Sequence, residues 1–135
     1  MIEVNYLAIV VGTIIAVTFS ALYYFLLNKR VVAYRTAQLG KKTDVQTTIS
    51  LNRFLVEFVR TFVLGLVLAN AIALLNLMEL NQAILLAIWL WIGFPVVLLT
   101  GLVIHERLSA PLVAIHAGDW FAKIMIFSIL LTLWR

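Results

Sequence analysis

Three ionisable side chains lie close together near the C-terminal end of an otherwise apolar chain: His116, Asp119 and Lys123. On an ideal α-helix, at about 100° per residue, they lie within about 60° of one another and form one polar face. Asp119 and Lys123 have i,i+4 spacing with the acid first, which favours an ion pair. The imidazole of His116, one turn away, can donate a hydrogen bond to the Asp119 carboxylate. Residues of these types on one face can hold an ion pair, or can transfer protons as an acid and a base.

Two further charged residues lie in an earlier apolar run. Glu57 and Arg60 are three residues apart, which places them on adjacent turns of a helix. Pairing of Glu57 with Lys123 and of Arg60 with Asp119 would neutralise all four charges. We therefore predict one polar cluster, with His105 near its rim, that contains six residues: Glu57, Arg60, His105, His116, Asp119 and Lys123.

The composition of the chain indicates that these residues lie in a membrane protein. Hydrophobic residues make up 64% of the 135-residue chain and charged residues 12%, with a mean hydropathy of +1.10. Soluble domains are about half apolar and about a quarter charged. A domain of this size cannot bury so much apolar surface, so the excess must face lipid and the chain must be an integral membrane protein. The chain has no cysteine, which excludes disulfides, thiolate catalysis and cysteine metal sites.

Four apolar runs are long enough to cross a bilayer, which takes about 20 residues. With short connections between them, the sequence predicts an all-α membrane protein: a single domain, residues 1–135, folded as a four-transmembrane-helix antiparallel bundle. Glu3 and no basic residue precede the first run, so we expect a retained helix rather than a cleaved signal peptide. The predicted spans cover residues 6–27, 54–75, 83–104 and 111–134.

The fourth span carries its charges deep in the bilayer. Lys123 is eleven residues from Trp134, or about 16 Å at helical rise, in a bilayer core about 30 Å thick. A charge at the centre of a span costs roughly 2.5–3.5 kcal/mol on insertion scales. The polar face of this helix must therefore point at protein or water rather than at lipid.

The basic residues predict the orientation of the chain. Nine of the ten Lys and Arg residues fall on the side of the first and third connections, and only Arg135 falls on the other side. The positive-inside rule makes the first side cytoplasmic and places both termini outside. The first connection also carries enough positive charge to bind anionic lipid. Because orientation explains the net charge of +4, we expect no nucleic-acid partner.

The sequence is compatible with two structures for the first connection, residues 28–52. In one, residues 31–39 continue the first helix into the cytoplasm and end at Gly40, and Thr43 with Gln46 forms a capping box for the next helix. In the other, the connection is a disordered basic loop.

Small residues at four-residue spacing predict where helices approach one another closely. They occur in three of the spans and indicate helix contact, either within one subunit or between subunits. The three stripes are Gly12, Ala16 and Ser20; Thr61, Gly65, Ala69 and Ala73; and Ala110, Ala114, Gly118 and Ala122.

The third span contains a proline and two tryptophans. Pro95 removes one backbone donor, which predicts a kink in this helix. Trp89 and Trp91 are two residues apart and therefore face different sides of it.

Several chemistries have little support in the sequence. The segment HERLS has Ser109 where a zinc-binding HExxH helix has its second histidine. His105 and His116 are too few for a metal site unless Glu57 or Asp119 completes it. The sequence contains no glycine-rich loop that would hold a phosphate. We therefore expect neither a metal nor a cofactor.

Short motifs along the chain match those of a known family. The first span contains NYLAIVV and FSALYYF, and further motifs follow from the third span onward: Trp91, Gly93 and Phe94, then Glu106 and Arg107, then Ile115 to Trp120, and finally Leu133, Trp134 and Arg135. In these motifs the chain resembles small bacterial membrane proteins that share the domain of unknown function numbered 1761. The resemblance implies four spans in a bacterial or archaeal inner membrane. It brings no activity, because none is established for the family.

The chain departs from that family's pattern at two positions. His116 stands where the family usually has Asn, and Asp119 stands where it usually has Tyr. The charged face of the fourth span is therefore a candidate feature of this chain rather than of the whole family.

Three functions are compatible with the predicted polar cluster. In the first, a homo-oligomer transports protons, ions or a small solute, and the cluster faces the cytoplasm. In the second, the charges are assembly contacts of a membrane scaffold or accessory subunit. In the third, His116 and Asp119 are the acid/base pair of a small membrane-embedded enzyme that acts on a lipid-soluble substrate. We favour transport over an enzyme.

Overall fold

The computed structural model describes residues 3–39 and 50–135. Helices account for most of these residues and include four that are long and apolar enough to cross a membrane, which confirms the predicted fold class. The ends of these four helices fall within three residues of the bounds predicted for the spans. The elements are α1 (Tyr6–Leu26), α2 (Asn28–Leu39), α3 (Leu51–Leu74), α4 (Leu80–Trp91), the π-helix η1 (Ile92–Val96), α5 (Val97–His105) and α6 (Ala110–Leu133).

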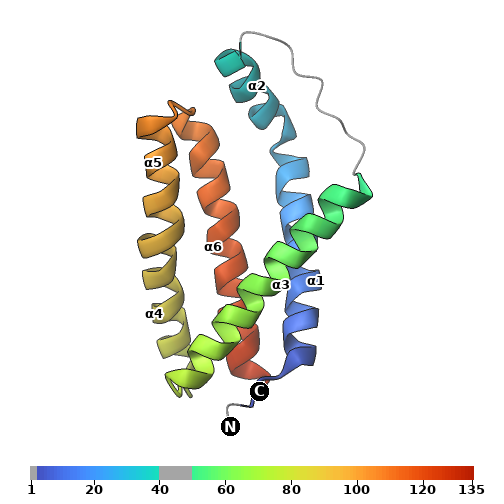
Figure 1. Cartoon of the computed structure of the whole chain (residues 1–135), viewed down its shortest axis with the longest axis vertical. Helices are drawn as coiled ribbons and strands as arrows, with labels where there is room; N and C mark the ends of the chain where they lie inside the picture. Colours follow the sequence, from blue (N-terminus) through green and yellow to red (C-terminus); the bar gives the residue numbers. More distant parts are fainter. Residues whose placement is uncertain (1–2, 40–49) are drawn as a thin grey trace.

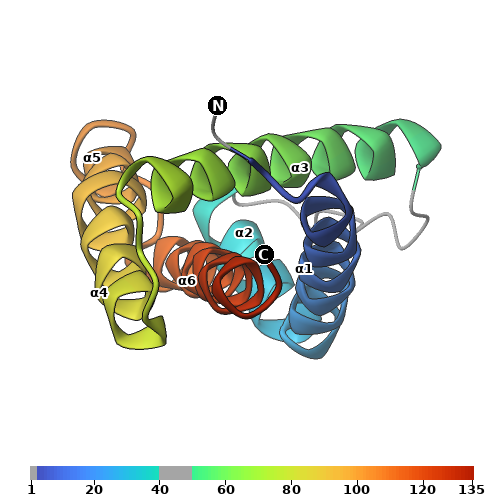
Figure 2. The same cartoon turned by 90° about the horizontal axis from the view of Figure 1, so that it is seen from below.

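Helix α6 lies at the centre of the bundle (Figure 2). It packs against α1 on one side and against α4 and α5 on the other, while α3 crosses a third side. Figure 1 shows that α3 runs obliquely to the other spans, and it packs on α1 and α6 more than on α4, the next helix in the chain. Because α6 is surrounded in this way, its polar face lies inside the protein.

The spans alternate in direction, so α1 begins at the end of the bundle where α6 finishes (Figure 1). The side-chain amide of Asn5 donates a hydrogen bond to the carbonyl of Trp134, at 3.4 Å, across this end. Asn5 also caps α1, because its side-chain oxygen accepts from the backbone N–H of Ala8 at 3.0 Å.

The short turn after α3 is built around Asn76. This residue has a φ of 50°, a left-handed conformation that Asn tolerates better than most residues. The N–H groups of Asn76 and Leu77 donate to the carbonyls of Ala73 and Ile72, each at 3.1 Å. This is a Schellman arrangement, which satisfies the last carbonyls of α3 and turns the chain into α4.

The first connection begins as a helix. Helix α2 follows α1 after the single residue Leu27, so residues 28–39 continue as a helix, as the first of the two alternatives predicted. Gly40, Thr43 and Gln46 lie outside the described residues. The observed N-cap of α3 is Ser50, whose hydroxyl accepts from the N–H of Arg53 at 3.3 Å.

The third span departs from α-helical geometry at Pro95. This residue lies within η1, a single π-helical turn that joins α4 to α5. Proline cannot donate the i→i−4 hydrogen bond, so the ladder changes register here. Trp89 is 65% exposed, whereas Trp91 is half-buried, and the two tryptophans therefore face different sides as their spacing predicts.

One aromatic ring fills the junction of three helices. Phe127 of α6 is fully buried and packs against glycines of both α1 and α3. A Cβ atom added to Gly12 would lie 2.7 Å from the ring, and one added to Gly65 would lie closer still. The absence of a side chain at these two positions is what lets the ring enter between the helices.

All three predicted small-residue stripes reach helix contacts, but that of α6 does so only in part. In α1 and α3, Gly12, Ala16, Ser20, Thr61, Gly65 and Ala69 are buried, and Ala73 is partly exposed. In α6, Ala110 and Ala114 are exposed, whereas a Cβ atom added to Gly118 would lie 2.5 Å from the Tyr23 hydroxyl of α1. The stripe of α6 therefore contacts α1 at Gly118.

Candidate functional site

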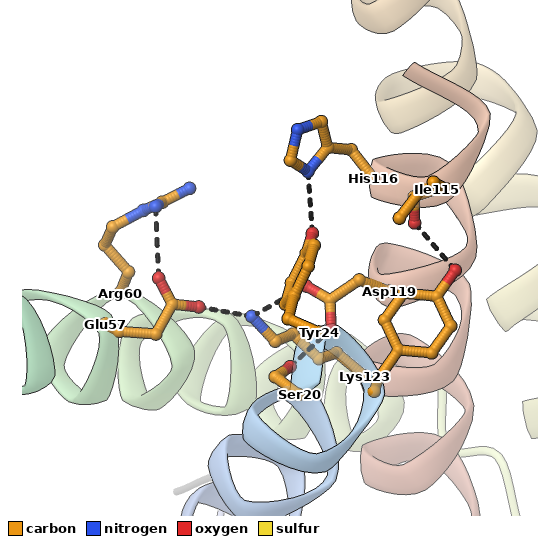
Figure 3. A network of polar contacts seen from close by, with 9 residues as sticks. Ser20, Tyr24, Glu57, Arg60, Ile115, His116, Asp119 and Lys123 are labelled. Carbon is orange, nitrogen blue, oxygen red and sulfur yellow. Dashed lines mark hydrogen bonds and ion pairs between the residues drawn. The ribbon is translucent and has the colours of Figure 1, made fainter. Parts of the chain in front are cut away.

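The two central charges of the candidate site lie on α6. The Asp119 and Lys123 side chains are each only 6% exposed, and Lys123 Nζ lies 3.2 Å from Asp119 Oδ2. Lys123 Nζ also donates a hydrogen bond to Glu57 Oε1 on α3 (Figure 3). The predicted contact between Glu57 and Lys123 is therefore present, and one ammonium group bridges two carboxylates from different helices.

The predicted pair between Arg60 and Asp119 is wrong. Arg60 Nη1 instead donates to Glu57 Oε2 at 3.2 Å, one turn away on its own helix. The second oxygen of Asp119 accepts a hydrogen bond from the hydroxyl of Ser20 on α1. Arg60 already has a carboxylate one turn away, and Ser20 supplies a partner for the Asp119 oxygen that does not contact Lys123. We call these five residues the ion network: Ser20, Asp119, Lys123, Glu57 and Arg60.

The predicted hydrogen bond from His116 to Asp119 is also not formed. His116 Nδ1 instead lies 2.6 Å from the hydroxyl of Tyr24 on α1 (Figure 3). The neighbouring Tyr23 donates its hydroxyl to the carbonyl of Ile115 at 2.8 Å. Two consecutive tyrosines thus tie the end of α1 to one turn of α6, immediately before Asp119.

His105 is separate from the other predicted members of the polar cluster. It is the last residue of α5 and is exposed. Within the described part of the chain, it makes no hydrogen bond or ion pair with the other five. The structure therefore brings together four of the six predicted residues: Glu57, Arg60, Asp119 and Lys123. His116 lies next to these four and contacts Tyr24 instead, and His105 lies outside the cluster.

The rotation of α6 is fixed from two sides. Tyr23 of α1 bonds to the Ile115 carbonyl, and Trp91 of α4 donates its indole N–H to the Ala117 carbonyl at 2.8 Å. The Trp91 ring also packs edge-on against Phe121, with the ring centroids 5.1 Å apart. Because α6 is held on both sides, its charged face points toward α1 and α3 rather than toward lipid.

Three residues of this site were not among the predicted site residues: Ser20, Tyr23 and Tyr24. Ser20 appeared only as a small packing residue, because a lone serine in a span is more often a packing residue than a ligand. One signal was available. Ser20 and Tyr24 have i,i+4 spacing and so share one face of α1, as Asp119 and His116 share one face of α6.

The ion network is electrically balanced. Two carboxylates, Asp119 and Glu57, face two cations, Lys123 and Arg60. Burying an unpaired charge is expensive, and removal of one partner of a buried pair typically costs about 3–5 kcal/mol. The exposure of the side chains rises along the network from 6% for Asp119 and Lys123 to 32% for Glu57 and 60% for Arg60. The network thus connects the interior of the spans to the surface.

Residues 3–39 and 50–135 contain no cluster of side chains suited to bind a metal ion. No three His, Cys, Asp or Glu side chains of these segments group closely enough to hold a metal ion through those residue types alone. The alternative in which His105 and His116 combine with Glu57 or Asp119 therefore has no geometric support.

Comparison with known proteins identifies the family but no activity. The family model described as "Protein of unknown function (DUF1761)" matches residues 7–132. No curated protein and no solved structure matches the chain. The chain belongs to the DUF1761 family.

Proposed function

We propose that this multi-pass membrane protein transports protons or small ions, and that the ion network forms the inner half of the route. The observation that carries the proposal is the position of Lys123, which is buried within a span and bridges carboxylates of two helices. Ionisable groups at this depth are costly and usually line substrate or proton pathways. The network offers titratable groups in direct contact, so a proton can move along it without the space that a hydrated ion needs.

The charge distribution supports an orientation for this route. In the described residues, five basic side chains lie on α2, at the start of α3 and in the turn between α5 and α6, all toward one end of the bundle: Lys29, Arg30, Arg35, Arg53 and Arg107. We propose that this end faces the cytoplasm of a bacterial or archaeal cell and that both termini lie outside. The exposed end of the network, at Glu57 and Arg60, then opens toward the cytoplasmic side. These basic residues would also attract anionic lipid.

The outer half of the route is closed in this conformation. Beyond the network, the Phe127 ring fills the space between Gly12 and Gly65. A surface pocket begins farther out and is lined by residues one turn beyond these contacts, Ala69 and Leu131 among them. Transport therefore requires that the Phe127 ring moves, or that several copies assemble around a shared route. That the protein is a homo-oligomer stays a prediction, which mass measurement in native lipid nanodiscs can test.

A flux assay in liposomes tests the proposal. Purified protein should dissipate an imposed pH gradient, and both Asp119→Asn and Lys123→Met should abolish this flux. Glu106→Gln is the matched control, because Glu106 is an exposed carboxylate in the turn before α6 and lies outside the network. Wild-type protein that is folded but passes neither protons nor small ions would contradict the proposal, as would full activity in both network variants.

A second candidate function, a scaffold or accessory subunit, is favoured by one specific observation. All four charges of the network are paired within one chain, as expected if they serve only to orient α1, α3 and α6. In that case the network variants lose stability or a copurifying partner, and no flux depends on them. The enzyme alternative has less support, because His116 and Asp119 each bond to other groups rather than to each other.

A further inference from the structure

A histidine and a tyrosine lie in contact beside the ion network, toward the end of the bundle that carries the basic residues. His116 Nδ1 is 2.6 Å from the hydroxyl of Tyr24, and both side chains are half-buried (Figure 3). We propose that His116 is the residue that takes up protons at the inner end of the route and passes them to Asp119, and that Tyr24 positions its ring. This inference rests on the proposed transport function and names the residue through which protons enter.

The contact between His116 and Tyr24 continues the ion network by one helical turn. Helices α1 and α6 bond to each other at two successive turns, first through Ser20 and Asp119 and then through Tyr24 and His116. The second contact is nearer to the basic end, because the C-terminus of α1 and the N-terminus of α6 lie there. A proton on His116 is therefore one turn from Asp119, the more deeply buried of the two carboxylates in the network.

An imidazole has a chemistry that the ion network lacks. The network contains two carboxylates, a lysine and an arginine. Side chains of these types have ordinary pKa values well below or well above neutrality, whereas that of histidine is about 6.5. The other histidine of the chain, His105, is exposed at the end of α5 and makes no hydrogen bond or ion pair with the network in residues 3–39 and 50–135. His116 is thus the residue of this site suited to take up and release protons near neutral pH.

Tyr24 determines how the ring of His116 is used. The tyrosine hydroxyl lies at Nδ1, and Figure 3 shows the second ring nitrogen, Nε2, turned away from Tyr24 and Lys123. A hydroxyl donates to a bare Nδ1 and accepts from a protonated one, so this contact survives a change of charge on the ring. The two rings also pack together, with their centroids 5.6 Å apart. A proton from the aqueous side therefore enters at Nε2 while Tyr24 holds the ring.

Asp119 is the acceptor for this proton. It lies three residues after His116 on the same face of α6, a spacing at which side chains of adjacent turns meet. When the ring turns from Tyr24 to Asp119, an N–H bond of the imidazolium breaks, an O–H bond forms on the carboxylate, and both side chains become neutral. Lys123 then keeps Glu57 as its charged partner, so its ammonium group is not left unpaired.

The charged and titratable groups around His116 come from four helices. Helices α4 and α5 and the turn η1 add one further titratable group, the exposed His105. Arg35 repels an imidazolium and Asp119 attracts it, so a proton on the ring is drawn inward. The groups are Tyr23 and Tyr24 of α1, Arg35 of α2, Glu57 and Arg60 of α3, and Asp119 and Lys123 of α6.

Proton flux through the purified full-length protein in liposomes tests the inference, with a membrane potential as the driving force and equal pH on both sides. Wild-type flux should rise as the pH falls from about 7.5 to about 5.5, because the protonated fraction of an imidazole rises over this range. His116→Gln should lower the flux about tenfold or more and remove this dependence on pH. His105→Gln is the matched control and should behave as the wild type, because His105 is exposed and lies outside the network.

Tyr24→Phe tests the positioning role. This variant keeps the aromatic ring and loses the hydroxyl, so the flux should fall roughly two- to tenfold, the effect of one hydrogen bond. Its dependence on pH should remain, because the imidazole is still present. Tyr6→Phe is the matched control at an exposed tyrosine of α1. Equal flux in these two variants would remove the positioning role of Tyr24.

Two results would overturn proton uptake by His116. One is equal flux in His116→Gln and His105→Gln, and the other is a lower flux in His116→Gln that keeps the wild-type dependence on pH. If the His116 variant does not fold, nitrogen-15 NMR of His105→Gln decides, because His116 is then the single histidine of the chain. Its ring must change charge over the pH range in which the flux changes, and a ring that keeps one charge there would refute the inference.

The inference and the transport proposal can fail separately. Flux that is lost in Asp119→Asn and Lys123→Met but kept in His116→Gln would refute uptake by His116 and leave transport intact. Folded wild-type protein that passes no protons would refute proton transport, and uptake by His116 with it.

Discussion

A methyl group at Gly65 should destabilise the contact between α3 and α6. A Cβ atom added there falls on the Phe127 ring, which is fully buried and also lies against Gly12 of α1. Because interiors are close-packed, a fully buried ring has little free space into which it can move. Overpacking of this kind typically costs about 1–3 kcal/mol.

Gly101 provides a matched control for this substitution. A Cβ atom added at Gly101 would meet nothing within 4 Å apart from its chain neighbours and the backbone of its own helix. Both glycines lie in α-helices, so each replacement by alanine gains a similar helix propensity of about 0.8–1.0 kcal/mol. That gain cancels when the two variants are compared. Gly65→Ala should therefore be about 1–3 kcal/mol less stable than Gly101→Ala.

Reversible unfolding in mixed micelles, followed by circular dichroism, measures this difference. The cause can be tested by the double variant Gly65→Ala with Phe127→Leu, in which the smaller side chain should reduce the cost of the added methyl group. If Gly65→Ala proves as stable as Gly101→Ala, the ring does not fill the three-helix junction as described. The same conclusion would follow if Phe127→Leu left the cost of the methyl group unchanged.

Three further predictions concern the ion network and the tyrosine contacts, and the same unfolding assay measures each. Lys123→Met leaves the buried Asp119 carboxylate without a cation, while Glu57 keeps Arg60, and should cost about 3–5 kcal/mol. The double variant with Asp119→Asn should be more stable than Lys123→Met alone, and equal stability would contradict the pairing. Arg60→Gln should cost less than about 1 kcal/mol, because this side chain is 60% exposed, and a larger loss would mean that it is more deeply buried. Tyr24→Phe should cost about 1 kcal/mol through the lost contact with His116, while Tyr6→Phe, at an exposed tyrosine, should be neutral.

The number and bounds of the spans were predictable because they depend on local composition. Lipid requires a long apolar run with satisfied backbone groups, and each such run is visible in the sequence. The contact between Glu57 and Lys123 was predictable for a related reason. Counted along the predicted spans, both residues are expected in the same half of the bilayer, and a buried charge needs an opposite charge within reach.

The partners of the remaining charges were not predictable, because depth does not fix the lateral arrangement of helices. Arg60 was expected to form an ion pair with Asp119, but it pairs with Glu57, whose carboxylate is one turn away on the same helix. Ser20 supplies the partner of Asp119 because α1 packs on the polar side of α6. The sequence of α6 does not say which neighbour covers which side.

Helix α3 runs obliquely, which explains why partners cannot be predicted by pairing residues at equal depth in the membrane. Along α3, Glu57 and Gly65 are eight residues apart, or about 12 Å at helical rise. Their partners on α6, Lys123 and Phe127, are only four residues apart, or about 6 Å. The two helices therefore cross at a large angle, and positions predicted from parallel spans drift out of register along their length.

The family resemblance suggests a further test at position 119. Replacement of Asp119 by tyrosine, the residue that the resemblance leads us to expect at this position, leaves Lys123 with Glu57 as its carboxylate partner. Lys123 and Arg60 then outweigh Glu57 by one positive charge, and the network loses the carboxylate nearest the centre of the bundle. Asp119→Tyr should therefore abolish the proposed proton flux, while the apolar contacts of Phe127 still hold the bundle together. Full flux in this variant would show that Asp119 is not part of the route.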